Sequence, residues 1–221
     1  ISPDLYHEFG HILQAMKVEL FGQRFLSELK SHITQLENKV RRTARPIKEE
    51  RILDIAFRWN SSWAEEVACD TMATLMLGAS YGWCNLQLCL QSSNVFDGGG
   101  KHPSDAARTK HILNVLRRCG FNDDAEKIEN LWNQYLRISQ QTISKYYDDY
   151  HPDSLFTAVM EDVEQAIKDN NFGITNKSAT IEILDEAWKQ FLENTSSFDQ
   201  WEKTAVMGLK KSFTNHKENK K

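Results

Sequence analysis

Residues 4–15 read DLYHEFGHILQA, and this stretch is where the sequence specifies its fold and its chemistry most strongly. Just before it, Ser2 can cap a helix and Pro3 suits the first helical position. The stretch therefore predicts a helix. Two histidines four residues apart, His7 and His11, then lie on the same face of that helix.

The rest of the chain also favours helices. Its 221 residues include only 4 Pro and 10 Gly, the residues that most often interrupt a helix. No stretch alternates with the two-residue period of a half-buried strand. The sequence therefore predicts a mainly α fold. Further helices are expected at residues 52–59, 63–77, 83–90, 104–119, 123–147, 153–170, 178–194 and 197–213.

Composition and charge argue against several classes of protein. The formal net charge is −4, so no basic field suggests nucleic acid as a partner. The 4 cysteines form no CxxC pair, which argues against a zinc ribbon or thioredoxin motif and favours a reducing, cytoplasmic location. No apolar run is long enough to predict a membrane span within this piece. Because residue 1 is Ile rather than Met, we expect a longer protein, and an upstream signal or membrane anchor stays open.

The segment His7–His11, HEFGH, is an HExxH motif. Imidazoles at positions i and i+4 of a helix can bind one zinc ion together. Glu8 lies one residue further round the helix, where its carboxylate can accept a proton from a water molecule on the metal. Gly10 leaves room for another element to pack closely behind the site. The motif therefore predicts a hydrolytic zinc site with Glu8 as the general base.

Two histidines alone make a poor catalytic zinc site, so a third ligand is needed. No further histidine follows at the spacing of the HExxHxxGxxH pattern. The helix expected at 63–77 offers carboxylates instead, because Glu66 and Asp70 are four residues apart on one face. Glu65 competes with Glu66 as the ligand, but the residue four positions after Glu65 is Cys69, which cannot orient an imidazole as a carboxylate does.

An HExxH motif followed by ExxxD resembles the gluzincins, the thermolysin-like clan of zinc peptidases. The resemblance implies that His7, His11 and Glu66 bind the zinc ion. It also implies that Asp70 hydrogen-bonds to a ligand histidine from behind and fixes its tautomer.

A second segment resembles one particular family of these zinc peptidases. Residues 101–108 read KHPSDAAR and resemble the HP…R segment of the CaaX prenyl protease and HtpX-type family. A long helical segment separates the motifs in that family, as 55 residues separate His11 from Glu66 here. The family's His and Arg contact the substrate or stabilise the oxyanion, and the resemblance implies this role for His102 and Arg108. Bacterial phage-exclusion peptidases also carry HExxH in a helical setting, and the sequence does not separate the two groups.

These resemblances imply an endopeptidase that hydrolyses a protein or peptide substrate with a zinc-bound water. They imply a helical, zincin-like catalytic domain over residues 1–150 and an additional C-terminal helical region with a basic tail over residues 151–221. The boundary is placed at His151-Pro152, the clearest break in the helical pattern. The sheet that precedes the zinc helix in such enzymes is expected to lie outside this chain.

The competing interpretation is an inactive helical binding module whose zinc site is structural or a relic. Apolar residues recur after position 23 at spacings of three and four and form a narrow stripe, nearly a coiled-coil seam. In this interpretation the stripe and the long C-terminal helices form the partner surface. The stripe consists of Leu26, Leu29, Ile33, Leu36 and Val40.

Overall fold

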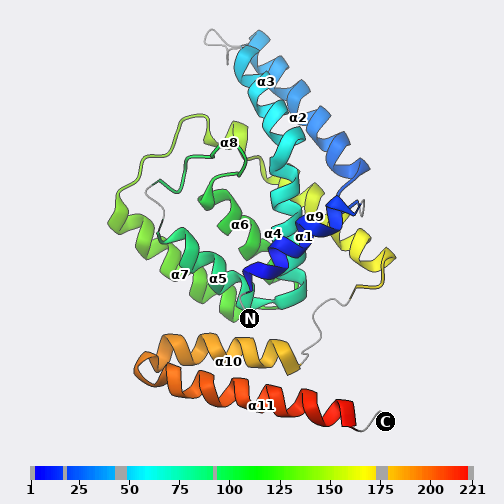
Figure 1. Ribbon diagram of the computed structural model, residues 1–221. Coiled ribbons are helices and arrows are strands. Elements are labelled where there is room, and N and C mark those ends of the chain that lie inside the picture. The colour runs from blue at the N-terminus through cyan, green and yellow to red at the C-terminus, as the bar shows by residue number, and fades with distance from the viewer. Residues whose placement is uncertain (1–2, 17–18, 43–48, 92–93, 173–178, 219–221) are drawn as a thin grey trace. The chain divides into compact units, whose positions relative to one another are not determined.

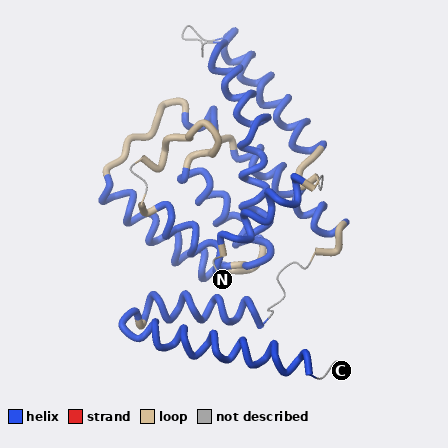
Figure 2. Tube along the Cα trace, in the orientation of Figure 1, coloured by secondary structure: helices blue, strands red, loops and turns tan. Residues whose placement is uncertain are grey.

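The computed structural model describes residues 3–16, 19–42, 49–91, 94–172 and 179–218. Within these ranges the chain forms helices and no β-strand, so the predicted mainly α fold is confirmed (Figure 2). The cap predicted at Ser2 lies outside the described residues. In chain order the elements in Figure 1 are α1 (Asp4–Ala15), α2 (Gln23–Arg42), α3 (Glu49–Arg58), η1 (Trp59–Trp63), α4 (Ala64–Leu77), α5 (Ala79–Cys89), α6 (Asp105–Arg118), α7 (Asn122–Ser139), α8 (Tyr147–Tyr150), α9 (Asp153–Asp169), α10 (Ala179–Glu193), η2 (Thr195–Ser197) and α11 (Phe198–Glu218).

Helix α4 lies at the centre of the fold because nearly all of its side chains are apolar or small. Every residue of α4 except Glu65 and Met76 is buried. A helix that is buried on all sides needs neighbours on all sides, and α1, α5, α6 and α9 pack around it (Figure 1). Two carboxylates of this helix, Glu66 and Asp70, are therefore held in the protein interior.

A π-helical turn, η1, joins α3 to α4 and closes the gap expected between the helices at 52–59 and 63–77. A π turn accommodates an extra residue within an otherwise α-helical segment. Trp59 and Trp63 at its ends are both buried, and their rings pack edge to face with centroids 5.9 Å apart. These two aromatic side chains fix the turn in the core.

The apolar stripe of α2 is covered within the chain. Leu29 and Leu36 are buried, and Ile33 and Val40 are partly buried against the same core. Helices α3 and α9 pack on α2, whereas Leu26 stays largely exposed. Most of the stripe that the binding-module interpretation assigns to a partner is therefore used to build this fold.

The structure breaks the single helix that the sequence predicts over residues 123–147. Helix α7 ends at Ser139, and Gln140 adopts a left-handed conformation with φ 48°. The side-chain oxygen of Gln141 then accepts a hydrogen bond of 2.6 Å from the backbone N–H of Val95. The single-helix prediction is wrong, because the left-handed turn at Gln140 ends the helix. Gln141, just after this turn, bonds to a distant segment that the local pattern does not reveal.

The chain forms two compact units, Ile1–Ile174 and Thr175–Lys221. Helix α9 belongs to the first unit because it packs on α2 and α4, so this unit extends past the boundary expected at residue 150. The second unit pairs α10 with α11, and an aromatic cluster that includes Phe191, Phe198 and Trp201 lies where the two helices join. Residues 219–221 of the predicted basic tail lie outside the described residues.

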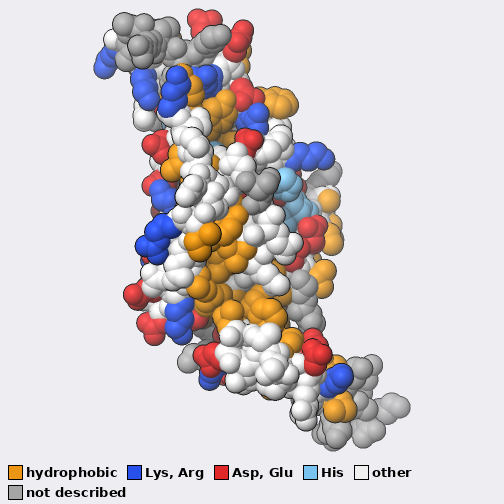
Figure 3. All heavy atoms as spheres, turned by 90° about the vertical axis from the view of Figure 1, so that its left-hand side faces the viewer, with side chains coloured by type: hydrophobic (Ala, Val, Ile, Leu, Met, Phe, Trp, Pro, Cys, Tyr) orange, Lys and Arg blue, Asp and Glu red, His pale blue; other side chains and the backbone are white. Residues whose placement is uncertain are grey.

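Hydrophobic side chains also reach the surface. Figure 3 shows a group of them near the middle of one face, with charged side chains around it. Exposed leucines and isoleucines of α5 and α7 include Leu88, Leu131 and Ile138. None of the described helices combines the length and the apolar character needed to cross a bilayer.

Gly10 allows α1 to lie close to α4. A Cβ atom at this position would be 2.7 Å from Cys69 Sγ and 3.1 Å from Cys69 Cα. The expectation that Gly10 leaves room for close packing is therefore confirmed. The same close approach brings the imidazoles of α1 within reach of the carboxylates of α4.

We predict that Gly10→Ala lowers the free energy of unfolding by about 1–3 kcal/mol, because α1 must move away from α4 to relieve the overlap. Chemical denaturation followed by circular dichroism measures this change. Gly22→Ala is the matched control, since no atom lies within 4 Å of its added Cβ. Equal stability of Gly10→Ala and the wild type would show that the two helices are not in close contact.

Candidate metal centre

The candidate metal centre lies where α1 packs on α4. His7 contacts Asp70 and Glu66, whereas His11 contacts Glu66 and Glu65. The earlier histidine on α1 thus contacts the later carboxylates on α4, and the later histidine contacts the earlier ones. Two pairs of residues spaced four apart, one on each helix, meet face to face because the helices run in opposite directions.

Three side chains converge on one point of this contact. His7 Nε2 lies 3.2 Å from His11 Nε2 and 3.2 Å from Glu66 Oε2. His11 Nε2 lies 3.5 Å from Glu66 Oε1. One ligand atom of each residue lies within 4.8 Å of the others, so this cluster can hold a metal ion. Of the two glutamates considered from the sequence, Glu66 is the one that joins the cluster.

The carboxylate of Glu66 fits a metal ligand. Its Oε2 atom is buried and has no hydrogen bond of acceptable geometry among the described residues, although His102 Nδ1 and His7 Nε2 lie 2.9 and 3.2 Å away. A buried carboxylate oxygen without a hydrogen bond is costly unless a cation compensates it. Burial alone would raise the pKa of Glu66, but the contacts with His102 and His7 lower it to about 2, so the carboxylate is ionised.

Asp70 fixes the tautomer of His7. Its Oδ1 atom lies 2.9 Å from His7 Nδ1 and accepts a hydrogen bond of 2.6 Å from the Tyr81 hydroxyl. Since Asp70 accepts and cannot donate, the proton between them belongs to His7 Nδ1, which leaves Nε2 to face the cluster. Asp70 thus contacts the ring nitrogen of His7 that lies away from the cluster. Its predicted role behind a metal ligand stays a prediction.

The same contacts govern the protonation of His7. Burial lowers the pKa of His7, but the close contacts with the Asp70 and Glu66 carboxylates outweigh burial and raise it to about 9. A metal ion takes the Nε2 lone pair and must displace this proton. Metal affinity is therefore expected to fall as the pH decreases.

Glu65 supports the second histidine. Its Oε1 atom lies 2.9 Å from His11 Nδ1, and both side chains are partly exposed. Glu65 therefore orients His11 as Asp70 orients His7, a role that sequence reasoning missed. The antiparallel packing of the helices was the missing information, because it brings the residue before Glu66 opposite His11.

His102 is brought to the cluster by the loop that precedes α6. Its Nδ1 atom lies 2.9 Å from Glu66 Oε2, and its side chain is 54% exposed. Arg58 anchors the loop by donating hydrogen bonds from Nη1 to the carbonyl oxygens of Gly98 and Gly99, at 3.3 and 3.0 Å. His102 therefore lies at the solvent-facing side of the cluster. Its predicted role toward a substrate stays a prediction.

Arg108 lies beneath the cluster. It donates to Asp70 from Nε and Nη2, at 2.7 and 2.8 Å, and its side chain is only 17% exposed. Burial would raise the pKa of Asp70, but the Arg108 guanidinium beside it holds that pKa well below its usual range. The structure thus places Arg108 behind His7, on a carboxylate, and its predicted contact with a substrate stays untested.

Glu8 lies on the exposed side of α1. Consecutive residues of an α-helix are about 100° apart, and residues four apart are about 40° apart. Glu8 therefore lies about 60° beyond His11, on the flank of the histidine pair that faces solvent. This position is suitable for a group that exchanges protons with a substrate or with water.

Comparison with protein-family models, curated proteins and solved structures gave no match to this chain. The function of the cluster must therefore be inferred from its own geometry.

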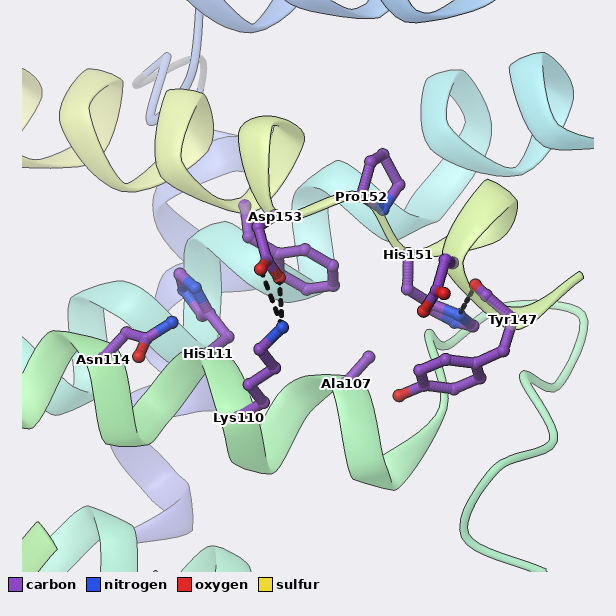
Figure 4. Close-up of a pocket in the computed structure, with 10 residues that line it drawn as sticks. Ala107, Lys110, His111, Asn114, Tyr147, His151, Pro152 and Asp153 are labelled. Atoms are coloured by element: carbon purple, nitrogen blue, oxygen red, sulfur yellow. Dashed lines mark hydrogen bonds and ion pairs between the residues drawn. The ribbon is translucent and has the colours of Figure 1, made fainter. Parts of the chain in front are cut away.

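A cavity of about 140 Å³ lies apart from the metal cluster, between α6 and the segment from α8 to α9 (Figure 4). Two of its charged groups are paired with each other: Lys110 Nζ donates to both carboxylate oxygens of Asp153, at 2.6 and 2.7 Å. His111 and His151 also line it. No residue predicted for the active site lines this cavity.

His151 supports the loop that carries His102. Its Nδ1–H donates to the Tyr147 carbonyl oxygen at 3.0 Å, and its Nε2 accepts the backbone N–H of Ser104 at 3.3 Å. The ring stacks on Trp63, with centroids 5.0 Å apart. An imidazole that accepts at Nε2 must be neutral, so protonation of His151 would break this support.

We predict that the protein loses stability as the pH falls from about 6.5 to 4. Burial lowers the pKa of both His111 and His151 from 6.5 to about 4. In this window the unfolded chain takes up the two protons and the folded chain does not. The free energy of unfolding should therefore fall by on the order of 1–3 kcal/mol per histidine. Urea titrations at a series of pH values measure it.

His151→Gln is the informative variant for this pH dependence. It should remove about half of the decrease, whatever its stability at pH 7. A free energy of unfolding that stays level between pH 6.5 and 4 would contradict the assignment of buried, neutral histidines.

Proposed function

We propose that this chain is the catalytic part of a zinc-dependent endopeptidase. The observation that carries the proposal is the spacing of the ligand atoms. Zinc bonds of about 2.0–2.1 Å in a tetrahedral arrangement place neighbouring ligand atoms roughly 3.3 Å apart. His7 Nε2 lies 3.2 Å from His11 Nε2 and 3.2 Å from Glu66 Oε2, and His11 Nε2 lies 3.5 Å from the other Glu66 oxygen, Oε1. One ligand atom of each residue lies within 4.8 Å of the others.

The set of ligands favours zinc over other common metal ions. Two imidazoles and one carboxylate are typical of a catalytic zinc site with an open fourth position. Magnesium and calcium prefer oxygen ligands alone. When bound, zinc would supply Lewis-acid polarisation of a peptide carbonyl and activation of a water molecule.

The chain's own residues would handle the proton and the peptide. Glu8, on the solvent-facing flank, would accept a proton from the attacking water and deliver it to the nitrogen of the leaving amine. His102 is half-exposed beside Glu66 and would donate a hydrogen bond to the oxygen of the scissile carbonyl. The resemblance of HExxH and ExxxD to the gluzincins supports the same assignment.

The first test is metal content. Purified wild-type protein should contain about one zinc ion per chain, and His11→Ala should lose it, because two remaining ligands bind zinc poorly. Plasma mass spectrometry measures the stoichiometry. His32→Ala is the matched control, since His32 lies outside the cluster and bonds to the Asp149 carbonyl oxygen. A wild-type chain without zinc after purification and zinc dialysis would refute the metal site.

The second test separates metal binding from catalysis. Glu8→Gln should keep the zinc ion and lose at least 100-fold in the rate of peptide hydrolysis, because only the proton transfer is removed. A library of fluorogenic peptides measures the rate. Unchanged hydrolysis by Glu8→Gln would exclude Glu8 as the general base.

One observation favours a second candidate, a helical module with a structural zinc ion. His102 Nδ1 lies 2.9 Å from Glu66 Oε2, so His102 can approach as a fourth ligand, and a site closed by four protein ligands is structural. Substitution by cobalt(II) distinguishes the two cases. A spectrum that changes in His102→Ala supports the structural site, and a spectrum that changes only with added peptide or hydroxamate supports the peptidase.

A further inference from the structure

We infer that Arg108 and Tyr81 are positioning residues that act through Asp70 to hold His7 in its metal-binding orientation. This inference rests on the metal site of the proposed function and assigns no peptide contact to either residue. The two residues come from α6 and α5 and meet the same carboxylate from different directions. The name clamp is used below for Arg108, Tyr81 and Asp70 together.

The clamp satisfies the Asp70 carboxylate on all sides. Oδ2 accepts from Arg108 Nε at 2.7 Å, and Oδ1 accepts from Arg108 Nη2 at 2.8 Å and from the Tyr81 hydroxyl at 2.6 Å. His7 Nδ1 completes the set at 2.9 Å. The Asp70 side chain has no exposed surface, so water cannot replace any of these donors.

The guanidinium fixes the carboxylate in a way that another cation would not. Its two parallel N–H groups engage both carboxylate oxygens and set the plane of the carboxylate. That plane decides where Oδ1 points, and Oδ1 directs the Nδ1–H group of His7. Because the imidazole is rigid, this direction also decides where Nε2 lies in the metal cluster.

Tyr81 limits the alternatives open to His7. The Tyr81 hydroxyl oxygen also lies 3.2 Å from His7 Nδ1, but its single proton is given to Asp70. Nδ1 therefore faces two acceptors and must carry a proton. Both neighbours thus favour the tautomer with a free Nε2 lone pair, which is the form that a metal ion needs.

The clamp also connects α4, which carries Asp70 and Glu66, to the loop that carries His102. Arg108 lies in the first turn of α6, whose cap residue Ser104 follows His102 by two positions. The ion pair with Asp70 thus holds the start of α6 against α4. The guanidinium of Arg108 therefore supports both His7, through Asp70, and the loop of His102, and it is not directed at a substrate.

The test is the zinc affinity of the full chain, measured by competition with a chromophoric chelator at constant pH. Arg108→Met should weaken zinc binding by about 10–100-fold, as expected when a partner behind a ligand histidine is lost. Arg108→Lys should recover only part of the affinity, because an ammonium group keeps the charge but lacks the planar fork. Tyr81→Phe removes one hydroxyl and should cost a smaller, measurable factor.

Arg117→Met is the matched control. Arg117 lies on the same helix, and its ion pair with Glu129 is at the surface. The same removal of an arginine there should leave zinc affinity unchanged. Adding Arg108→Met to Asp70→Asn should cost less than it does in the wild type, because the carboxylate through which Arg108 acts is already gone.

A spectroscopic readout separates positioning from a general loss of stability. In zinc-loaded protein, the Nδ1 proton of His7 should give a slowly exchanging NMR signal in the wild type and in Arg117→Met. It should exchange faster with water in Arg108→Met and Tyr81→Phe. A variant that unfolds more easily without changing this signal or the zinc affinity would have lost a structural ion pair only.

Three results would overturn the inference. Wild-type zinc affinity in both Arg108→Met and Tyr81→Phe would exclude positioning while leaving the metal site intact. Unchanged affinity together with a reduced kcat/KM would instead assign Arg108 to the substrate. A wild-type chain that takes up no zinc would refute the proposed function and the clamp together. If Arg108→Met does not fold, Tyr81→Phe alone decides, because the loss of one hydroxyl leaves the packing in place.

Discussion

The structure depends on a negative charge buried at its centre, the carboxylate of Asp70. A buried, unpaired charge costs several kcal/mol, so the surrounding helices must supply donors. They do so from three directions: α1 with His7, α5 with Tyr81 and α6 with Arg108. The requirement to satisfy one carboxylate thus fixes how three helices meet α4. The geometry of the metal cluster is a consequence of that arrangement.

The site is asymmetric in its exposure to water. His7 is buried with Asp70, whereas His11 and its partner Glu65 are partly exposed. The buried half provides rigidity, because no solvent competes for its hydrogen bonds. The exposed half, with Glu8 on its flank, provides access. The proposed hydrolytic function would use both properties, which are divided here between two histidines one helical turn apart.

Much of the fold and the site follows from local sequence patterns. The scarcity of Pro and Gly predicts helices, and the spacing of four residues places His7 and His11 on one helix face and Glu66 and Asp70 on another. That these two faces meet was implied by the resemblance to the gluzincins, and the structure brings the four side chains together. Local patterns fail where a contact between segments far apart in the sequence determines the structure. Gln141, just past the end of α7, bonds to Val95, and Tyr81 of α5 bonds to Asp70, yet neither contact has a signature in the sequence. The partner of Arg108 could not be predicted for the same reason.

The π-helical turn between α3 and α4 sets the phase of the central helix. Helix α3, the π-helical turn and α4 follow one another without a break over residues 49–77. Without the extra residue, every side chain after Trp63 would be rotated by about 100° relative to α3. Glu66 and Asp70 would then point away from the histidines, although no residue of the cluster had changed. The turn thus sets the rotation of α4 so that a helix buried on all sides also presents Glu66 and Asp70 to the histidines.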